Sequence, residues 1–266
     1  FTLSRSDYYS LKPIIKASMH DIDFEIKIFV GGAHLLKRFG RTIDAIKSDG
    51  FTNISTIAYL KEDDDTSSDF AHAYYRAVKP FVEVLDDNQP DFVFILGDRW
   101  EMLALATSAS LLRIPIAHHS GGDVTQGSSD NQIRFSITSL AHLHFVSLPI
   151  HKKRLLKMGE ENWRIFVTGE PALCNKKNIK IDGEKLLRKL DIKIDENFVL
   201  ATYHPTTYEK YNFEDQVALF IAGLNYIKET IILTIPNPDP GCESIISKLK
   251  KYAEKKPNVK IIKNLG

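Results

Sequence analysis

The sequence predicts an α/β protein made of two doubly wound domains, each built on a parallel sheet. Apolar runs of strand length and amphipathic helical patterns alternate along the whole chain, as in right-handed crossover units. Several of these runs, such as 92–96, are continuously apolar rather than alternating, which is typical of strands covered on both faces. The length of 266 residues favours two domains over one. We place them at 1–168 and 169–266.

The first domain is expected to carry most of the elements. A strand end at 1–3 leads through a polar turn into a helix at 8–18, and a strand at 24–30 is stopped by two glycines. The remaining elements continue the alternation. They are strands at 54–60, 92–96, 114–117, 145–147 and 165–168, a helical patch at 35–39, and helices at 70–85, 102–112, 130–141 and 151–158.

The second domain is expected to begin at the Gly-Glu-Pro turn 169–171, which is typical of a domain junction. Since the chain opens on the end of a strand and closes on a strand with no helix after it, we expect further residues beyond both ends. The elements of this domain are helices at 185–190, 217–224 and 244–253, and strands at 198–203, 231–235 and 259–262.

The composition argues against several classes of protein. Hydrophobic residues make up 43% of the chain and the net charge is +1, so no charge excess favours nucleic acid or a membrane surface. The longest apolar runs have strand length, which predicts neither a membrane span nor a signal peptide and makes the cytoplasm the expected location. Cys174 and Cys242 lie far apart without a CxxC pattern, so they indicate neither a disulfide framework nor a zinc site.

The segment 91–144 is where we expect the functional site. A strand at 92–96 is followed by Asp98, and a strand at 114–117 is followed by His118 and a glycine-bounded loop. In an open α/β sheet, ligands bind in the crevice outside the carboxyl ends of the strands. The segment brings four polar side chains to that edge: Asp98, His118, Asp123 and Asp130.

The acidic residues of this segment each have a catalytic and a structural interpretation. Asp98 could stabilise positive charge on a substrate or cap the helix that follows it, and Arg99 could bind an anion at the same helix N-terminus. Asp123, in a partly desolvated loop, suits proton abstraction, although Asp beside Gly is also a common turn residue. Asp130 could also take part in catalysis, or it could cap its helix and pair with Arg134 at i+4.

Histidines and acidic residues gather in two places without matching a metal motif. His118 and His119 leave one strand together, and His142 and His144 lie close by, but their spacing fits no zinc site. Hydrogen-bonded structural histidines are therefore the preferred interpretation. The acidic run 61–69 lacks the calcium-loop spacing and is interpreted as a solvated loop.

The sequence also lacks a GxGxxG after a strand and a GxxxxGK[ST] motif, which argues against a dehydrogenase or a P-loop enzyme. His204 ends the first strand of the second domain and could donate to a phosphate or to the substrate. From the residues alone, we predict a two-domain enzyme with acidic groups and an anionic ligand. They do not name the reaction.

An ordered set of short motifs runs through nearly the whole chain. They are TLSRSDY at 2–8, GDRWEM at 97–102, PIAH at 115–118, GGDVTQG at 121–127, DNQIR at 130–134, HLHF at 142–145, GEPAL at 169–173 and YHPTT at 203–207. Each motif is weak by itself, but the ordered set is specific. Together they resemble the hydrolysing UDP-N-acetylglucosamine 2-epimerases, in the branch that feeds the synthesis of sialic acid and legionaminic acid.

The resemblance implies two Rossmann-like domains of the glycosyltransferase B type, with a UDP-sugar in the cleft between them. It implies a reaction in which a carboxylate removes the C2 proton while UDP leaves C1. Water then adds to the glycal-like intermediate and gives the free 2-epimer, N-acetylmannosamine or a diacetamido analogue. The resemblance implies no metal and no nicotinamide cofactor, and it implies a homodimer.

The resemblance also implies roles for individual residues. Asp98 would stabilise the oxocarbenium-like transition state, and Asp123 and Asp130 would share the acid and base steps. Arg5 and His204 would hold the diphosphate. The substrate-binding set as a whole would be Arg5, Asp7, Arg99, His118, Arg134 and His204.

The chain departs from the family at several positions. Relatives commonly carry Glu in place of Asp123, His or Glu in place of Ser120, and often His in place of Phe135. The family's serine-rich phosphate loop and its uridine-binding acidic residue are not found in these 266 residues. A modified sugar, such as one with a second acetamido group, is consistent with these changes. A glycosyltransferase of the same fold and a catalytically silent sugar-nucleotide sensor remain alternatives.

Overall fold

The protein divides into two compact units. The computed structural model describes residues 1–174, 183–192, 197–204, 213–237 and 239–262. The first unit is Phe1–Lys177 and the second is Asn178–Gly266, and each is described by itself. None of the described helices has the length and apolar character needed to cross a membrane.

The first unit extends past the boundary that the sequence placed at 168/169. The Gly169 carbonyl lies 3.2 Å from Nε2 of His119, and Glu170 accepts a hydrogen bond of 2.9 Å from Ser10. These contacts hold the beginning of the junction segment against the first unit.

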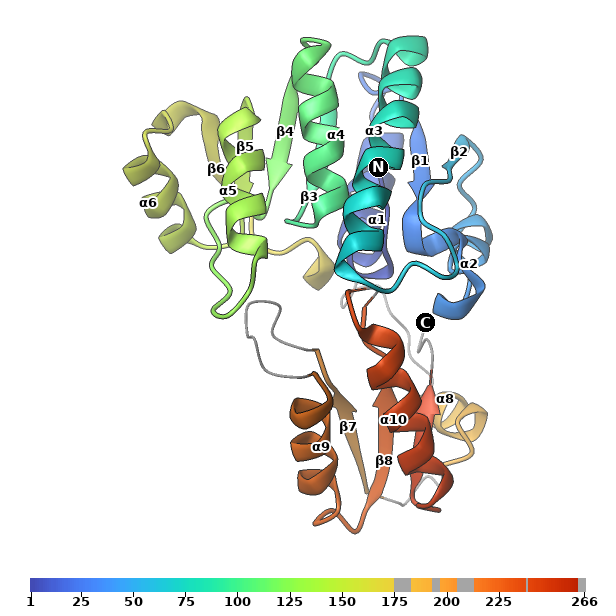
Figure 1. The fold of residues 1–266 in the computed structure, drawn as a ribbon. Coiled ribbons are helices and arrows are strands. Elements are labelled where there is room, and N and C mark those ends of the chain that lie inside the picture. The colour runs from blue at the N-terminus through green and yellow to red at the C-terminus, as the bar shows by residue number, and fades with distance from the viewer. Residues whose placement is uncertain (175–182, 193–196, 205–212, 238, 263–266) are drawn as a thin grey trace. The chain divides into compact units, whose positions relative to one another are not determined.

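The strand pairs in the described residues are all parallel, as the alternation of elements predicts (Figure 1). The main sheet of the first unit has the order β3-β4-β5-β6, and β1 pairs with β2 in the same unit. The sheet of the second unit has the order β7-β8-β9. The strands are β1 (Ile28–Gly31), β2 (Ile54–Ile57), β3 (Val93–Leu96), β4 (Ile116–His119), β5 (Leu143–Val146), β6 (Ile165–Val167), β7 (Phe198–Thr202), β8 (Thr230–Thr234) and β9 (Val259–Ile262).

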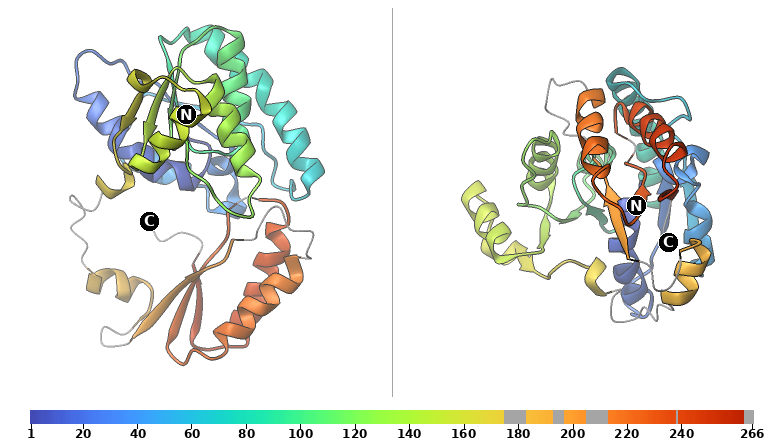
Figure 2. Two further views of the ribbon diagram at one scale, coloured as in Figure 1. Left: turned by 90° about the vertical axis from the view of Figure 1, so that its left-hand side faces the viewer. Right: turned by 90° about the horizontal axis from the view of Figure 1, so that it is seen from below.

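The helix α4 forms the centre of the first unit's helical layer. It packs between α3 and α5 and against β3 and β4 (Figures 1 and 2). Met102, Leu105 and Ala109 of α4 are fully buried because neighbours cover nearly every side of the helix. The helices are α1 (Arg5–Met19), α2 (Ile43–Ser48), α3 (Ser67–Asn88), α4 (Trp100–Leu111), α5 (Asp130–Leu140), α6 (Pro149–Met158), α8 (Gly183–Lys189), α9 (Phe213–Leu224) and α10 (Cys242–Glu254), with short 3₁₀ turns η1 (Gly32–Leu35), η2 (Lys37–Phe39) and η3 (Asn162–Arg164).

The strand β4 runs two residues further than predicted, so His118 and His119 lie inside it rather than after it. Both side chains are buried. Nε2 of His118 lies 2.9 Å from the Gly97 carbonyl, and Nδ1 of His119 lies 2.8 Å from the Ser120 hydroxyl. The sequence ended the strand at its first polar residue, but bonded ring nitrogens let the histidines continue it.

The acidic run before α3 is structural at Asp64. This carboxylate is buried, forms an ion pair with Arg76 and accepts a hydrogen bond of 2.8 Å from the Lys61 backbone. Thr66 and Asp69 then cap each other at the start of α3. The run therefore ties its loop to α3, and the expectation of a solvated loop is wrong at Asp64.

Candidate functional site

A cavity of about 290 Å³ lies in the first unit at the carboxyl ends of the main strands. It receives residues from the start of α1, the turn after β3, the loop after β4, α5 and the segment after β6. This is the sheet edge at which the sequence placed the site. Its walls are formed by Ser6, Asp7, Ser10, Leu96, Gly97, Asp98, Arg99, Ser120, Asp123, Arg134 and Glu170.

Asp98 reaches the cavity because Gly97, at a φ of +89°, turns the chain after β3. Its carboxylate forms an ion pair with Arg134 of α5. The alternative interpretation of Asp98 as a helix cap is wrong, since Arg99 is the N-cap of α4 and the Asp98 carboxylate pairs with Arg134. The predicted Asp130–Arg134 pair is also wrong within the described residues, because Arg134 binds a carboxylate from a different element.

The guanidinium of Arg134 is almost fully buried, with 5% of its side chain exposed. Burial, and after it repulsion from Arg154, lowers the pKa of Arg134. The Asp98 carboxylate is more open, at 22% exposed. The pair therefore presents a carboxylate to the cavity that is fixed in place by a positive charge behind it.

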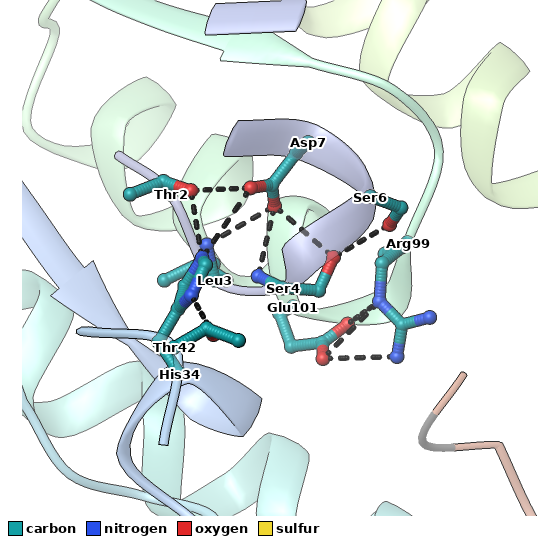
Figure 3. Close-up of polar contacts among 9 residues, drawn as sticks. All are labelled: Thr2, Leu3, Ser4, Ser6, Asp7, His34, Thr42, Arg99 and Glu101. Atoms are coloured by element: carbon teal, nitrogen blue, oxygen red, sulfur yellow. Dashed lines mark hydrogen bonds and ion pairs between the residues drawn. The ribbon is translucent and has the colours of Figure 1, made fainter. Parts of the chain in front are cut away.

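Arg99 lies in the cavity wall but already has an anionic partner. Its Nε lies 3.1 Å from Glu101, whose side chain is fully buried (Figure 3). The sequence predicted Arg99 as an anion-binding residue and did not identify Glu101. Because Glu101 balances the charge of Arg99, the pair adds little net positive charge to the cavity.

Asp123 has a more exposed side chain than Asp98, the other predicted catalytic carboxylate that lines the cavity. Its side chain is 49% exposed, and Oδ1 accepts a hydrogen bond of 2.7 Å from the Val124 backbone. The same Oδ1 lies 3.6 Å from Nε2 of His151 on α6. In the described part of the chain, Oδ2 has no recorded partner. One oxygen is thus anchored and the other is available to a ligand.

The loop that carries Asp123 is held tightly against α6. Gly122 has a φ of +73°, and a Cβ at this position would lie 2.6 Å from the backbone oxygen of His151. Arg154, one turn later on α6, donates a hydrogen bond to the Gly122 carbonyl. No sequence pattern indicates either α6 residue, since their role depends on contacts between distant segments.

Asp130 does not line this cavity in the described structure. It is the first residue of α5, and its backbone N–H donates to the Ser128 hydroxyl at 3.1 Å. The cavity therefore brings together two of the three predicted catalytic carboxylates, Asp98 and Asp123.

Asp7 faces the cavity but is saturated by its own turn (Figure 3). Oδ2 accepts hydrogen bonds of 3.0 Å from the backbones of Leu3 and Ser4, and Oδ1 accepts one from the Thr2 hydroxyl. Nε2 of His34 lies 2.9 Å from the same hydroxyl. Only 3% of Asp7 is exposed. The geometry favours a brace for the start of α1 over the predicted contact with substrate.

Glu170 is a further cavity carboxylate to which the sequence assigned no role. It accepts hydrogen bonds of 2.9 Å from Ser10 on α1 and 3.3 Å from Ser147 after β5. The acidic residue was visible in the Gly-Glu-Pro turn, but only the fold shows that this turn returns to α1.

His118 lies behind the cavity rather than in its wall. Burial lowers its pKa to about 4, so its ring is neutral at pH 7. Because Nε2 bonds to the carbonyl of Gly97, the ring supports the turn that carries Asp98. We interpret His118 as a support for the site instead of a substrate ligand.

Arg5 and His204 are outside the set of described residues that line this cavity. Arg5 is the first residue of α1, and burial lowers its pKa. His204 follows β7 in the second unit and is exposed. Their predicted contacts with a diphosphate remain predictions.

The fold defines the class of protein: two Rossmann-like units of the glycosyltransferase B type. The chain superposes on the UDP-GlcNAc 2-epimerase of Methanocaldococcus jannaschii, solved with UDP-GlcNAc and UDP, with a TM-score of 0.76 at 20% identity over 97% of this chain and 71% of that one. The Neisseria meningitidis UDP-GlcNAc 2-epimerase, solved with UDP-GlcNAc, gives a TM-score of 0.74 at 15% identity over 97% and 70%. The predicted fold class is confirmed.

The chain belongs to the UDP-N-acetylglucosamine 2-epimerase family, whose model matches residues 16–266. It is 36% identical to the GDP/UDP-N,N'-diacetylbacillosamine 2-epimerase (hydrolyzing) of Campylobacter jejuni, over 99% of this chain and 69% of that protein. It is 33% identical to the UDP-N,N'-diacetylbacillosamine 2-epimerase (hydrolyzing) of Legionella pneumophila, over 99% and 70%. The resemblance to the hydrolysing UDP-N-acetylglucosamine 2-epimerases is confirmed, whereas the branch for sialic and legionaminic acid stays a prediction.

Proposed function

We propose that the protein is a hydrolysing 2-epimerase that converts a UDP-2,4-diacetamido sugar into the free 2-epimer and UDP. The observation that carries the proposal is the cavity that joins Asp98 and Asp123 at the strand ends of a chain from this family. The diacetamido substrate is supported by the names of the two relatives that are 36% and 33% identical.

Asp123 is the proposed base of the first step. Its unanchored Oδ2 takes the proton from C2, the electrons of that C–H bond form a double bond between C1 and C2, and the C1–O bond breaks as UDP leaves. Water then adds its oxygen to C1 while C2 receives a proton on the opposite face. The sum is hydrolysis with inversion at C2.

Asp98 is the proposed stabiliser of positive charge at C1. Because Arg134 fixes its carboxylate, Asp98 is oriented before the substrate arrives, and the partly buried setting strengthens its field. Asp130 is proposed to share the second proton transfer with Asp123, and Arg5 and His204 to contact the diphosphate. Charge near the leaving group is required because UDP departs as an anion.

The proposal is tested with the purified protein in heavy water. UDP-N-acetylglucosamine and the UDP-2,4-diacetamido-6-deoxy sugar are supplied separately, and UDP release and deuterium at C2 are followed by NMR. We expect both signals, with the larger kcat/KM for the diacetamido compound. UDP release that requires a sugar acceptor would indicate a transferase, and binding without release would indicate a sensor.

Two further proposals concern the pathway that uses the product and the oligomeric state and location of the protein. We propose that the product enters the synthesis of a sialic-acid-like sugar, in support of which the chain is 26% identical to the polysialic acid biosynthesis protein P7 of Escherichia coli. We also propose a homodimer that acts in the cytoplasm. Sedimentation of the purified protein tests the dimer, and cell fractionation tests the location.

A further inference from the structure

We propose that His151 of α6 is a positioning residue for Asp123, and that its Nε2 donates a hydrogen bond to Oδ1 when substrate binds. The inference rests on the proposed function. Neither the motifs of the family resemblance nor the acidic cluster at the strand ends contains His151. It would make Asp123 and His151 an aspartate–histidine pair in which the histidine orients the base.

The position of the ring supports this role. Nε2 of His151 lies 3.6 Å from Oδ1 of Asp123, slightly beyond a hydrogen bond. Contacts of this kind are often long without substrate and shorten in the reacting complex. The ring is 9% exposed and belongs to a helix that also fixes the loop, so a small movement of the half-exposed Asp123 is enough to close the distance.

The pairing leaves the correct oxygen for catalysis. The Val124 backbone donates a hydrogen bond to Oδ1, and Nε2 of His151 faces the same oxygen. Oδ2 has no hydrogen-bond partner among the residues that the structure describes. A carboxylate held by one oxygen keeps its other oxygen aimed at a fixed place. His151 thus restricts the rotation of the Asp123 side chain without occupying the oxygen that accepts the proton.

The surroundings of His151 place its N–H donor on Nε2. Asp123 faces this nitrogen from the loop. Nδ1 of His151 is buried without a partner in the described structure, so a proton on that nitrogen would be unsatisfied. The proton therefore belongs on Nε2, toward Asp123.

A second pair in the same unit shows what a structural histidine looks like. Nε2 of His144 lies 2.9 Å from Glu160, which also binds Arg164 at 2.7 Å. Glu160 is 12% exposed and its partners are protein groups, whereas Asp123 is open to the cavity. This pair supplies the matched control.

The test compares His151→Leu, His151→Gln and His144→Leu in the deuterium assay. His151→Leu removes the donor and is expected to lower kcat on the order of 10- to 100-fold with KM changed by less than about threefold. His151→Gln keeps an Nε2 donor and should stay within about threefold of the original protein. His144→Leu removes the donor to Glu160, lowers the melting temperature and leaves kcat unchanged below that temperature.

A double-mutant cycle separates positioning from mere packing. In a double-mutant cycle, Asp123→Glu should abolish most of the effect of His151→Leu, because the longer side chain places its oxygens elsewhere.

Two failures are distinguishable. If the original protein releases no UDP and incorporates no deuterium, the proposed function is wrong. If the original protein is active and folded His151→Leu keeps its kcat, the function stands and the role of His151 is overturned. Equal losses in His151→Leu and His151→Gln would also overturn it, since the donor would then not matter.

Discussion

The first turn of α1 and the loop after β4 both bring a carboxylate to the same cavity, and they use it in opposite ways. Asp7 has 3% of its surface exposed, and both of its oxygens accept hydrogen bonds from its own turn. Asp123 has a side chain that is 49% exposed and anchors one oxygen. A saturated carboxylate stabilises the backbone around it, whereas a partly engaged one remains available for chemistry. Hydrogen-bond occupancy, more than position, distinguishes them.

The largest expected effect concerns Asp123, the half-exposed carboxylate of this pair. Asp123→Asn removes the proposed base and should lower kcat by about 10²- to 10⁴-fold. Because the side chain is half-exposed, the free energy of unfolding should change by less than about 0.5 kcal/mol. Single-turnover UDP release and urea unfolding measure the two quantities. A fully active Asp123→Asn would remove the loop from the catalytic site.

Asp98 is intermediate between Asp7 and Asp123, because its carboxylate is paired with Arg134 and still partly exposed. Asp98→Asn leaves the buried Arg134 without an anionic partner, so we expect a loss of about 3 kcal/mol in stability. We also expect kcat to fall by roughly 10²-fold, because charge at C1 is no longer stabilised. Urea unfolding and the deuterium assay measure both. A loss of stability alone would make Asp98 a structural carboxylate like Asp7. A loss of kcat alone would make it a catalytic carboxylate like Asp123.

His118, whose ring is buried and hydrogen-bonded, should affect how the stability of the protein depends on pH. Its folded-state pKa is about 4, below the value of about 6.5 for an unfolded chain. Its contribution to stability is therefore complete above about pH 6.5 and is lost as the pH falls toward 4, by about 2 kcal/mol between pH 7 and pH 5. Urea unfolding at both pH values should show a smaller difference in His118→Gln. An unchanged difference would contradict the assignment.

Asp7 is the buried carboxylate of the pair, so its substitution is the counterpart of Asp123→Asn. Asp7→Asn places an amide where backbone N–H groups and the Thr2 hydroxyl donate, so stability should fall by about 2 kcal/mol. With the protein kept folded at low temperature, kcat should stay within about fivefold of the original value. A large loss of kcat in a folded Asp7→Asn would show that saturation is a poor guide to function.

Ser120 should give the smallest effect. It has a φ of +72° and bonds to His119 at 2.8 Å, so Ser120→Gly relieves backbone strain while losing a hydrogen bond. We expect a net change within about 1 kcal/mol. Ser120→Ala loses the bond and keeps the strain, so it should be less stable than Ser120→Gly by about 1 kcal/mol in thermal unfolding. The reverse order would show that the strain is negligible.

The sequence was sufficient for the alternation of elements because that alternation is a local property. The run 92–96 became β3, and the helical spacing after Gly97 became α4. The sequence also predicted the sheet edge at which the cavity lies, since parallel strands end at a common edge. It ended β4 too early because two histidines are polar in sequence but satisfied in the fold.

The side-chain pairings could not be predicted because they join segments that are distant in the chain. Local spacing favoured Asp130 as the partner of Arg134, but the fold supplied Asp98. Nothing near His151 in the sequence indicates that α6 returns to the loop after β4. Choosing among acidic residues therefore required counting which oxygens were already occupied.

The close approach between Gly122 and α6 has a consequence for engineering. A library that randomises only the loop from 121 to 127, in order to admit a different sugar, would recover glycine at 122 in nearly every folded clone, since any side chain there meets the backbone of His151. Diversifying the loop together with α6 offers the wider search, because the helix can then shift to admit a new loop shape.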